Sequence, residues 1–206
     1  MKYIDLTHTF VDNMPVFPGD PATTLKQITS ISKEGYTDHQ LTTVMHVGTH
    51  MDAPLHMIAG GKYMSEISID HFVGPGLLVD ARNKKIVDGD LLHGLTIPRG
   101  GIVLVLTGMD KKYKTPAYDT GHPSFTESFA RAMVAAGVKI LGMDVINPDT
   151  QESYPVHKIL LSKEVLIIEN CTNLESLVGV KSFEVFAFPM KLHAEAAPVR
   201  VVARVG

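Results

Sequence analysis

The sequence predicts a single α/β domain over residues 1–206, with one mixed sheet and more strand than helix. Three observations support this class. Hydrophobic residues make up 45% of the chain and charged residues 20%, which is the usual composition of a globular domain. The chain is shorter than the ~250 residues beyond which single cores tend to divide, and it shows no repeat or low-complexity linker. Short β-branched segments bounded by Gly, Pro, Asn and Asp recur along its length.

Nine segments have the alternating or β-branched apolar pattern of strands. They lie at about residues 3–7, 22–30, 40–46, 76–81, 101–107, 138–144, 165–170, 183–191 and 198–205. A helical segment stands between the strands at 101–107 and 138–144, and this order implies a parallel crossover. We expect the remaining strands to be antiparallel.

Three segments are expected to be helical. The clearest one covers 124–136, because Ser-Phe-Thr-Glu from Ser124 forms a capping box and Gly137 is placed to end the helix. A shorter helix is expected after Asp88, whose side chain can cap it. A further helix is expected over Pro155–Leu161, with proline at its first position.

Charge and cysteine content exclude several classes of protein. The chain has 19 Lys+Arg and 22 Asp+Glu, so it lacks the basic surplus that binds nucleic acid or anionic membranes. Its longest aliphatic run, Ile102–Leu106, is far shorter than the ~20 residues of a membrane-spanning helix. The start Met1–Asp5 carries an acid where a secretory signal has its apolar region. The single Cys171 suits a reducing compartment, so we expect a cytoplasmic protein without nucleic-acid or membrane partners.

Histidine is the compositional outlier, since three of the ten histidines fall within residues 46–56. In a helix Asp52 would lie off the face shared by His46 and His50, and the proline that follows resists helix. In an extended chain His46, His50, Asp52 and His56 point the same way, and Gly48 permits the bend that two ligands of one ion require. Two imidazoles and a carboxylate with an open position are typical of hydrolytic Zn²⁺ or Mn²⁺ sites.

Other interpretations of single residues stay open at this point. The histidines could be ordinary polar residues, although burying them together without an ion would leave polar groups competing for partners. Asp144 could orient a ligand histidine or cap the following turn. Cys171 is not expected to be a nucleophile, because a buried cysteine at a strand end is usually inert. No Gly-x-Ser-x-Gly elbow is present, and Gly74–Gly76 lacks the third glycine of a dinucleotide loop, so serine hydrolases and NAD enzymes are excluded.

The pattern His-x-Gly-Thr-His-x-Asp-x-Pro-x-His over residues 46–56 resembles the metal-binding motif of the cyclase family of metal-dependent hydrolases. Bacterial kynurenine formamidases and isatin hydrolases are members of that family. The likeness continues in further segments along nearly the whole chain, at Asp5–Thr7, Met14–Asp20, Gly142–Asp144, Pro155–Leu161 and Ile167–Asn170. It implies a swivelling β/β/α-like fold.

The resemblance also implies two divalent ions per chain, either Zn²⁺ or Mn²⁺. The first ion would be held by His46, His50 and Asp52, and Asp52 would bridge to a second ion. His157 and Glu169 would complete the second site, although without the resemblance Glu169 reads as a solvated strand end. His56 would stay free of metal as the proton-transfer residue.

The activity implied by the resemblance is hydrolysis of a small amide, such as the arylformamide N-formylkynurenine of tryptophan catabolism. The ions would lower the pKa of bound water towards ~7, and the resulting metal-bound hydroxide would attack the polarised carbonyl. His56 would carry a proton to the leaving nitrogen. An isatin-type lactam or lactone hydrolase is the alternative enzyme. A catalytically silent metal- or small-molecule-binding protein is the third possibility, against which the free His56 argues.

Two departures from the family pattern concern the substrate. Phe17 stands where the family often has Trp, so we expect Phe17 to contact substrate through a smaller ring. The segment Glu195–Pro198 replaces the usual Asp-Gly-Ser before its proline. The resemblance further implies a homodimer or larger homo-oligomer, in which neighbouring subunits help to close the pocket.

Overall fold

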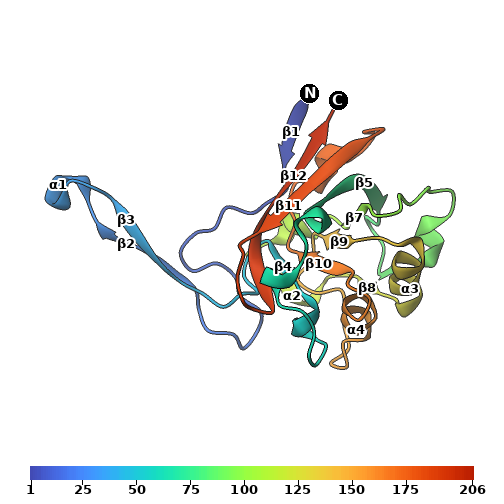
Figure 1. Ribbon diagram of the computed structural model, residues 1–206, viewed down its shortest axis with the longest axis horizontal. Coiled ribbons are helices and arrows are strands. Elements are labelled where there is room, and N and C mark those ends of the chain that lie inside the picture. The colour runs from blue at the N-terminus through green and yellow to red at the C-terminus, as the bar shows by residue number, and fades with distance from the viewer.

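A sheet of eight strands that closes on itself forms the centre of the computed structural model, which describes residues 1–206 (Figure 1). The strand order is β1-β12-β11-β5-β7-β9-β10-β4, and β12 also pairs with β4. The first residues of β12 pair with β4, and its later residues pair with β11 and β1. Seven strands therefore form a closed barrel, and β1 adds to its outside. The strands of this sheet are β1 (Lys2–Asp5), β4 (His50–Asp52), β5 (Val73–Asp80), β7 (Ile102–Leu106), β9 (Ile140–Met143), β10 (Leu166–Glu169), β11 (Phe183–Pro189) and β12 (Ala196–Val205).

Helices and short strands lie outside the barrel. The α-helices are α1 (Ile31–Glu34), α2 (Pro116–Thr120), α3 (Glu127–Ala136) and α4 (Pro155–Leu161). Two small strand pairs are β2 (Thr24–Thr29) with β3 (Asp38–Thr42) and β6 (Ile86–Val87) with β8 (Ser124–Phe125). Single 3₁₀ turns cover Pro54–His56, Met64–Glu66, Ile69–Phe72, Gly89–Leu92, Met109–Lys112 and Leu174–Leu177. No helix has the length and apolar character needed to cross a membrane.

Strand direction divides the barrel into two parts. Strands β5, β7, β9 and β10 run parallel to one another, and β4, β11, β12 and β1 join by antiparallel pairing. The mixed sheet and its parallel crossover through α3 are confirmed. The expectation that the strands near 76–81 and 165–170 are antiparallel is wrong. Both belong to crossovers that travel over the outside of the barrel before the next strand enters in the same direction.

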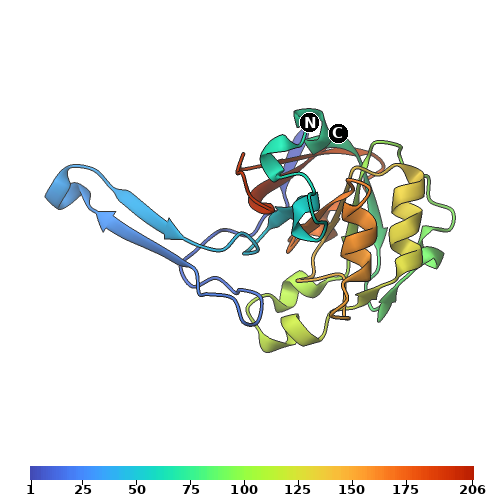
Figure 2. The same ribbon diagram turned by 60° about the horizontal axis from the view of Figure 1, so that its bottom comes forward.

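The core has one part inside the barrel and one part outside it. Alternate residues of β7 show the division, because Ile102 and Leu104 belong to the interior cluster whereas Val103 and Val105 pack under the helices. Helices α3 and α4 lie side by side over that outer face (Figure 2). A strand that is buried on both faces needs apolar residues at every position, which explains the uninterrupted apolar sequence of β7.

Helix α3 begins at Glu127, three residues later than expected. Ser124 belongs to β8, and its backbone N–H donates to the carbonyl of Lys85. Thr126 is the N-cap instead, and its hydroxyl accepts from the N–H of Phe129 at 3.2 Å. Gly137 ends the helix in the left-handed conformation, as expected. Ser124 and Phe125, the first two residues of the capping-box pattern, therefore belong to a strand and not to the helix.

The other helical expectations are confirmed. Helix α4 has the bounds Pro155–Leu161, with proline in its first turn. Asp88 accepts the N–H of Asp90 and caps the turn Gly89–Leu92, which is a 3₁₀ turn.

Residues 24–42 form an arm that projects from the barrel (Figures 1 and 2). In it β2 and β3 pair only with each other, and α1 lies at its tip. All five residues of β3 are exposed. The segments expected as strands at 22–30 and 40–46 thus build the arm, and the second strand ends at Thr42, so that the following residues lead into the barrel.

Candidate metal centre

A bend at Gly48 brings His46 and His50 together. Gly48 has φ +61°, a conformation that glycine adopts readily, and β4 begins two residues later at His50. The imidazole rings of His46 and His50 have centroids 5.0 Å apart. A straight strand would separate the two residues by roughly 13 Å. Val47 and Met51 point into the core, as the alternating pattern predicts.

His56 also lies beside His46, but the backbone that carries it is not extended as expected. Residues Pro54–His56 form a 3₁₀ turn, so the extended chain ends after β4. Proline at the first position of a helical turn explains this, because its fixed φ suits the turn. The turn sets the His56 ring 4.2 Å from the His46 ring and 5.7 Å from the His157 ring, measured between centroids.

Asp52 lies at the middle of the histidines and is completely buried. Its Oδ1 is 3.0 Å from Nδ1 of His46 and 3.6 Å from Nε2 of His50. Its Oδ2 is 3.6 Å from Nε2 of His157. Burial alone would raise the pKa of Asp52, but contacts with His157 and His46 hold that pKa well below its usual value. The carboxylate is therefore charged and faces three imidazoles.

Glu169 joins the cluster from the neighbouring strand. It ends β10, which pairs with β4 so that Glu169 stands opposite His50. Its Oε2 is 3.4 Å from Nε2 of His50, and its Oε1 is 3.3 Å from Nε2 of His157. Only 6% of Glu169 is exposed, so the structure excludes a solvated strand end.

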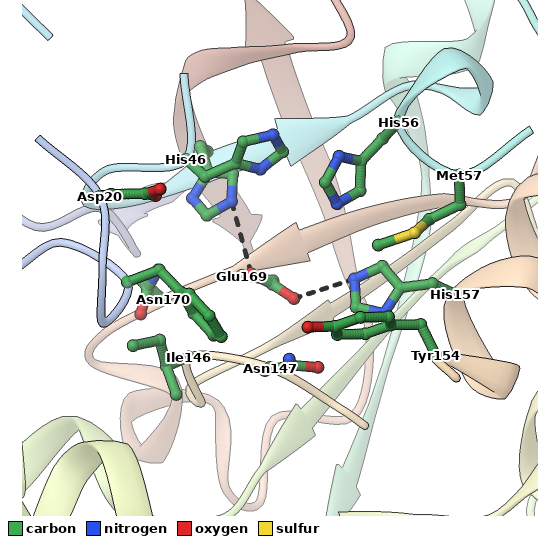
Figure 3. A pocket seen from close by; sticks show the side chains of 12 residues that line it. Asp20, His46, His56, Met57, Ile146, Asn147, Tyr154, His157, Glu169 and Asn170 are labelled. Carbon is green, nitrogen blue, oxygen red and sulfur yellow. Dashed lines mark ion pairs between the residues drawn. The ribbon is translucent and has the colours of Figure 1, made fainter. Parts of the chain in front are cut away.

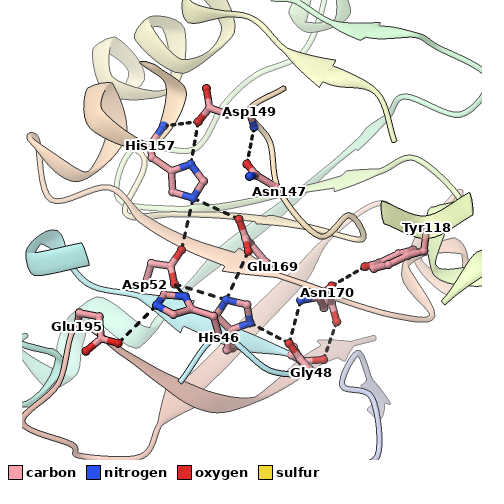
Figure 4. A network of polar contacts seen from close by, with 12 residues as sticks. His46, Gly48, Asp52, Tyr118, Asn147, Asp149, His157, Glu169, Asn170 and Glu195 are labelled. Carbon is pink, nitrogen blue, oxygen red and sulfur yellow. Dashed lines mark hydrogen bonds and ion pairs between the residues drawn. The ribbon is translucent and has the colours of Figure 1, made fainter. Parts of the chain in front are cut away.

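Asp149 orients His157. It is buried, and its Oδ2 is 2.8 Å from Nδ1 of His157 and accepts the backbone N–H of that residue at 3.1 Å (Figure 4). Its Oδ1 accepts the N–H of Val156 at 2.9 Å. This keeps a proton on Nδ1 of His157 and directs Nε2 towards Asp52 and Glu169. Sequence reasoning missed Asp149, although an acid shortly before a proline-initiated helix is a recognisable partner for first-turn N–H groups.

A second series of hydrogen bonds orients His50. Its Nδ1 is 2.8 Å from the carbonyl oxygen of Gly48, which also accepts from Nδ2 of Asn170 at 3.0 Å. The Tyr118 hydroxyl donates to Oδ1 of Asn170 at 2.6 Å (Figure 4). Nε2 of His50 is thereby directed towards Asp52 and Glu169. Asn170 follows Glu169 directly, so β10 supplies both a cluster residue and a residue that positions its partner.

Four buried atoms of the cluster lack hydrogen-bond partners. Nε2 of His50, both oxygens of Asp52 and Oε1 of Glu169 are buried without one. Leaving such groups unpaired costs free energy that a cation at this point would offset. Nitrogen and oxygen donors of this kind are those that Zn²⁺ and Mn²⁺ take. The residues therefore fit a metal centre.

Two groups of three residues bring their donor atoms within 4.8 Å of one another. One group is His46, Asp52 and His56, and the other is His50, Asp52 and Glu169. Asp52 is common to both groups. The division of ligands between two ions, and the freedom of His56 from metal, stay predictions.

Protonation in this cluster depends on its neighbours. Burial lowers the pKa of His50, but the carboxylates of Glu169 and Asp52 outweigh it and raise that pKa to about 9. The pKa of His157 is likewise raised well above its usual value, because the carboxylates of Asp149, Asp52 and Glu169 that face its ring outweigh the effect of burial. His56 is different, since burial lowers its pKa. His56 is therefore mainly neutral at pH 7.

A cavity of about 250 Å³, called the inner cavity below, opens onto the cluster (Figure 3). It is lined by the cluster histidines, Glu169 and Asn170, and by Phe17, Asp20, Met57, Ile146, Asn147 and Tyr154. Phe17, expected at the substrate, does line it and is 36% exposed. No Lys or Arg lines the inner cavity.

Two residues weighed from the sequence lie away from this chemistry. Asp144 accepts from the N–H and hydroxyl of Thr107 and from the N–H of Gly108, so it orients no ligand histidine and does not cap the following turn. It instead fixes the loop after β7. Cys171 is buried, and burial raises the pKa of its thiol, so the expectation that it is not a nucleophile is supported.

Glu195 approaches the cluster without having been predicted there. Its Oε1 is 3.6 Å from Nε2 of His46. The segment Glu195–Pro198 attracted notice as a departure from the family pattern, and this was the signal available in the sequence. Pairing of Ala196 with Asp52 in the sheet places Glu195 beside the cluster.

Comparison with known proteins agrees with the resemblance. The family model described as "Putative cyclase" matches residues 4–150. The chain belongs to the cyclase family. A kynurenine formamidase from Delftia acidovorans is 30% identical over 196 residues, which cover 92% of this chain and 91% of that protein.

Two solved structures are also similar to the chain. A "predicted metal-dependent hydrolase" from Bacillus stearothermophilus is 30% identical with a TM-score of 0.79, covering 98% of this chain and 97% of that one. Isatin hydrolase A from Labrenzia aggregata has a TM-score of 0.87 at 23% identity, covering 99% and 93% of the two chains. At that identity the likeness shows the fold, and it confirms the strand-rich, mixed-sheet fold expected from the resemblance to the cyclase family.

Proposed function

We propose that this cyclase-family protein is a metal-dependent hydrolase that cleaves the C–N bond of a small arylformamide, such as N-formylkynurenine. The observation that carries the proposal is the buried cluster around Asp52, in which four candidate ligand atoms of His50, Asp52 and Glu169 make no hydrogen bond within the chain. Relatives named kynurenine formamidase that are 25% to 30% identical over at least 92% of the chain support the reaction class. The reaction is hydrolysis of a carbon–nitrogen bond other than a peptide bond.

Two divalent ions, Zn²⁺ or Mn²⁺, are proposed at the cluster. His46, His50 and Asp52 would hold the first, and Asp52, His157 and Glu169 the second. Ions at this place would supply hydroxide from water at neutral pH and polarise the substrate carbonyl.

His56 is proposed as the proton-transfer residue. Hydrolysis adds water to the formyl carbon, breaks the bond to nitrogen and yields formate and an aryl amine. The attacking water loses a proton and the leaving nitrogen gains one. The neutral His56 ring lines the inner cavity, and it can accept the first proton and donate the second.

An isatin-type lactam hydrolase is the second candidate. The inner cavity contains the carboxylate of Asp20 but no Lys or Arg, so the carboxylate of N-formylkynurenine would find no cationic partner there. A neutral lactam needs none. Turnover of N-formylkynurenine and of isatin by protein loaded with Zn²⁺ or Mn²⁺ separates the two, and an excess of kcat/KM for N-formylkynurenine supports the arylformamide. Absence of hydrolysis across formamides, lactams and lactones would overturn the proposal in favour of a binding protein.

A homodimer is proposed from the arm of residues 24–42. An isolated two-stranded hairpin is marginally stable in water, and this one has no strand partner in the barrel. Its side chains Ile28, Ile31, Tyr36 and Leu41 are between 44% and 72% exposed. A second copy that covers the arm would bury these groups. Light scattering on wild type and on Ile28→Asp/Leu41→Asp tests this, with a dimer expected for wild type and a monomer for the variant; a monomeric wild type would contradict it.

A cytoplasmic location stays part of the proposal. It is supported by the single free thiol, which suits a reducing compartment.

A further inference from the structure

Two cavities meet at one wall beside the cluster. An outer cavity of about 190 Å³ adjoins the inner one, and Phe17, Ile146, Asn147 and Tyr154 line both. Ligand pockets commonly measure ~300–1,000 Å³, a size that neither cavity reaches alone but that the two reach together. A substrate larger than the inner cavity would therefore have to extend past these four residues.

The backbone holds Tyr154 firmly in this wall. Tyr154 has φ 48° and ψ 53°, a left-handed conformation that is costly for a residue with a side chain, directly before Pro155. Its N–H donates to the carbonyl of Gln151 at 3.0 Å, and its own carbonyl accepts from the N–H of Lys158 at 3.1 Å. Conformations of this kind persist where their surroundings fix them and concentrate at ligand sites.

The Tyr154 ring occupies the boundary between the cavities. Its plane is nearly perpendicular to the His157 ring, with centroids 6.0 Å apart. Figure 3 shows the ring beside His157 with its hydroxyl directed towards the middle of the inner cavity. Phe17 supplies another six-membered aromatic ring to the same wall. Flat aromatic groups gain attraction from such rings beyond the area they bury.

We propose that Tyr154 is a specificity-determining residue that selects substrates with a flat aromatic ring. The substrate ring lies against Tyr154, the scissile amide lies in the inner cavity, and substituents of the ring extend into the outer cavity. This inference rests on the proposed function for the amide. It adds the residue that recognises the aryl group.

Binding of two amides to the metal-free protein tests the inference without turnover. Acetanilide carries a flat ring, and N-cyclohexylacetamide has the same number of non-hydrogen atoms in a puckered ring. Kd is measured by ligand-observed NMR for wild type, Tyr154→Leu and Tyr154→Phe, with Tyr3→Leu on the exposed outer strand as control. KM and kcat for formanilide are then measured on the metal-loaded proteins.

Wild type is expected to prefer acetanilide, and Tyr154→Leu to weaken acetanilide binding about three- to tenfold while changing N-cyclohexylacetamide less than twofold. Tyr154→Phe keeps the preference, and Tyr154→Leu raises KM for formanilide more than it lowers kcat. Equal weakening of both amides by Tyr154→Leu, or no weakening, would overturn the inference. If the preference and its loss are observed but no formamide is hydrolysed, the proposed function fails and the role of Tyr154 stands.

Discussion

Replacing Asp149 by Asn tests how the protein orients His157. The two oxygens of Asp149 serve three donors, which are the N–H of Val156 and the N–H and Nδ1–H of His157. Asparagine retains one oxygen, so at least one donor must face its NH₂ group. In either orientation Nδ1–H of His157 loses the carboxylate charge that helps to direct Nε2 to Asp52 and Glu169. Loss of such a partner typically weakens metal binding 10–100-fold, which corresponds to about 1.4–2.7 kcal/mol.

The assay is competition for Zn²⁺ against a chromogenic chelator, with metal-free protein at fixed pH. Glu152→Gln is the matched control, because Glu152 is exposed three residues away and also changes from carboxylate to amide. Circular dichroism of the metal-free variants checks that both are folded. A folded Asp149→Asn protein whose Zn²⁺ affinity lies within twofold of wild type would refute the reasoning.

Three further predictions follow from the same geometry. His56→Ala should retain its metal and lose about 10²–10⁴-fold in kcat, because a positioned proton-transfer group contributes that much; loss of metal, measured by elemental analysis, would make His56 a ligand. Zn²⁺ affinity should rise with pH up to about 9, because the metal must displace protons from His50 and His157, whose pKa values are raised in the metal-free protein; a flat profile by calorimetry would contradict this. Gly48→Ala should lower the free energy of unfolding by about 1–2 kcal/mol, since φ is +61° there; an unchanged urea midpoint would be the contrary result.

The sequence best predicts those structural features that depend on one residue and its immediate neighbours. Pro155 begins α4 and Gly137 ends α3, because fixed φ and left-handed backbone are local properties. The spacing of His46, His50 and Asp52 around Gly48 also predicts their meeting. These features depend on few neighbours, so single residues determine them.

Features that depend on contacts between distant parts of the chain were harder to predict from the sequence. The predicted start of α3 was wrong because Ser124 pairs with Ile86 in another strand. The parallel directions of β5 and β10 were missed because they depend on the paths of the crossover connections, which no single residue indicates. The role of Glu195 depends on which strands are neighbours, because the pairing of β12 with β4 places it beside the cluster. The position of Glu169 in the cluster came from the family resemblance, since a strand-end acid by itself does not reveal that it is buried.

Metal content per chain tests the central claim most directly. Protein purified without a metal-chelating tag and incubated with Zn²⁺ or Mn²⁺ is measured by elemental analysis beside Asp52→Ala, because Asp52 belongs to both groups of candidate ligands. About two equivalents of one divalent metal in wild type, largely lost in the variant, is the predicted result. One equivalent would contradict the second site at His157 and Glu169, and no bound metal would contradict the proposed hydrolase.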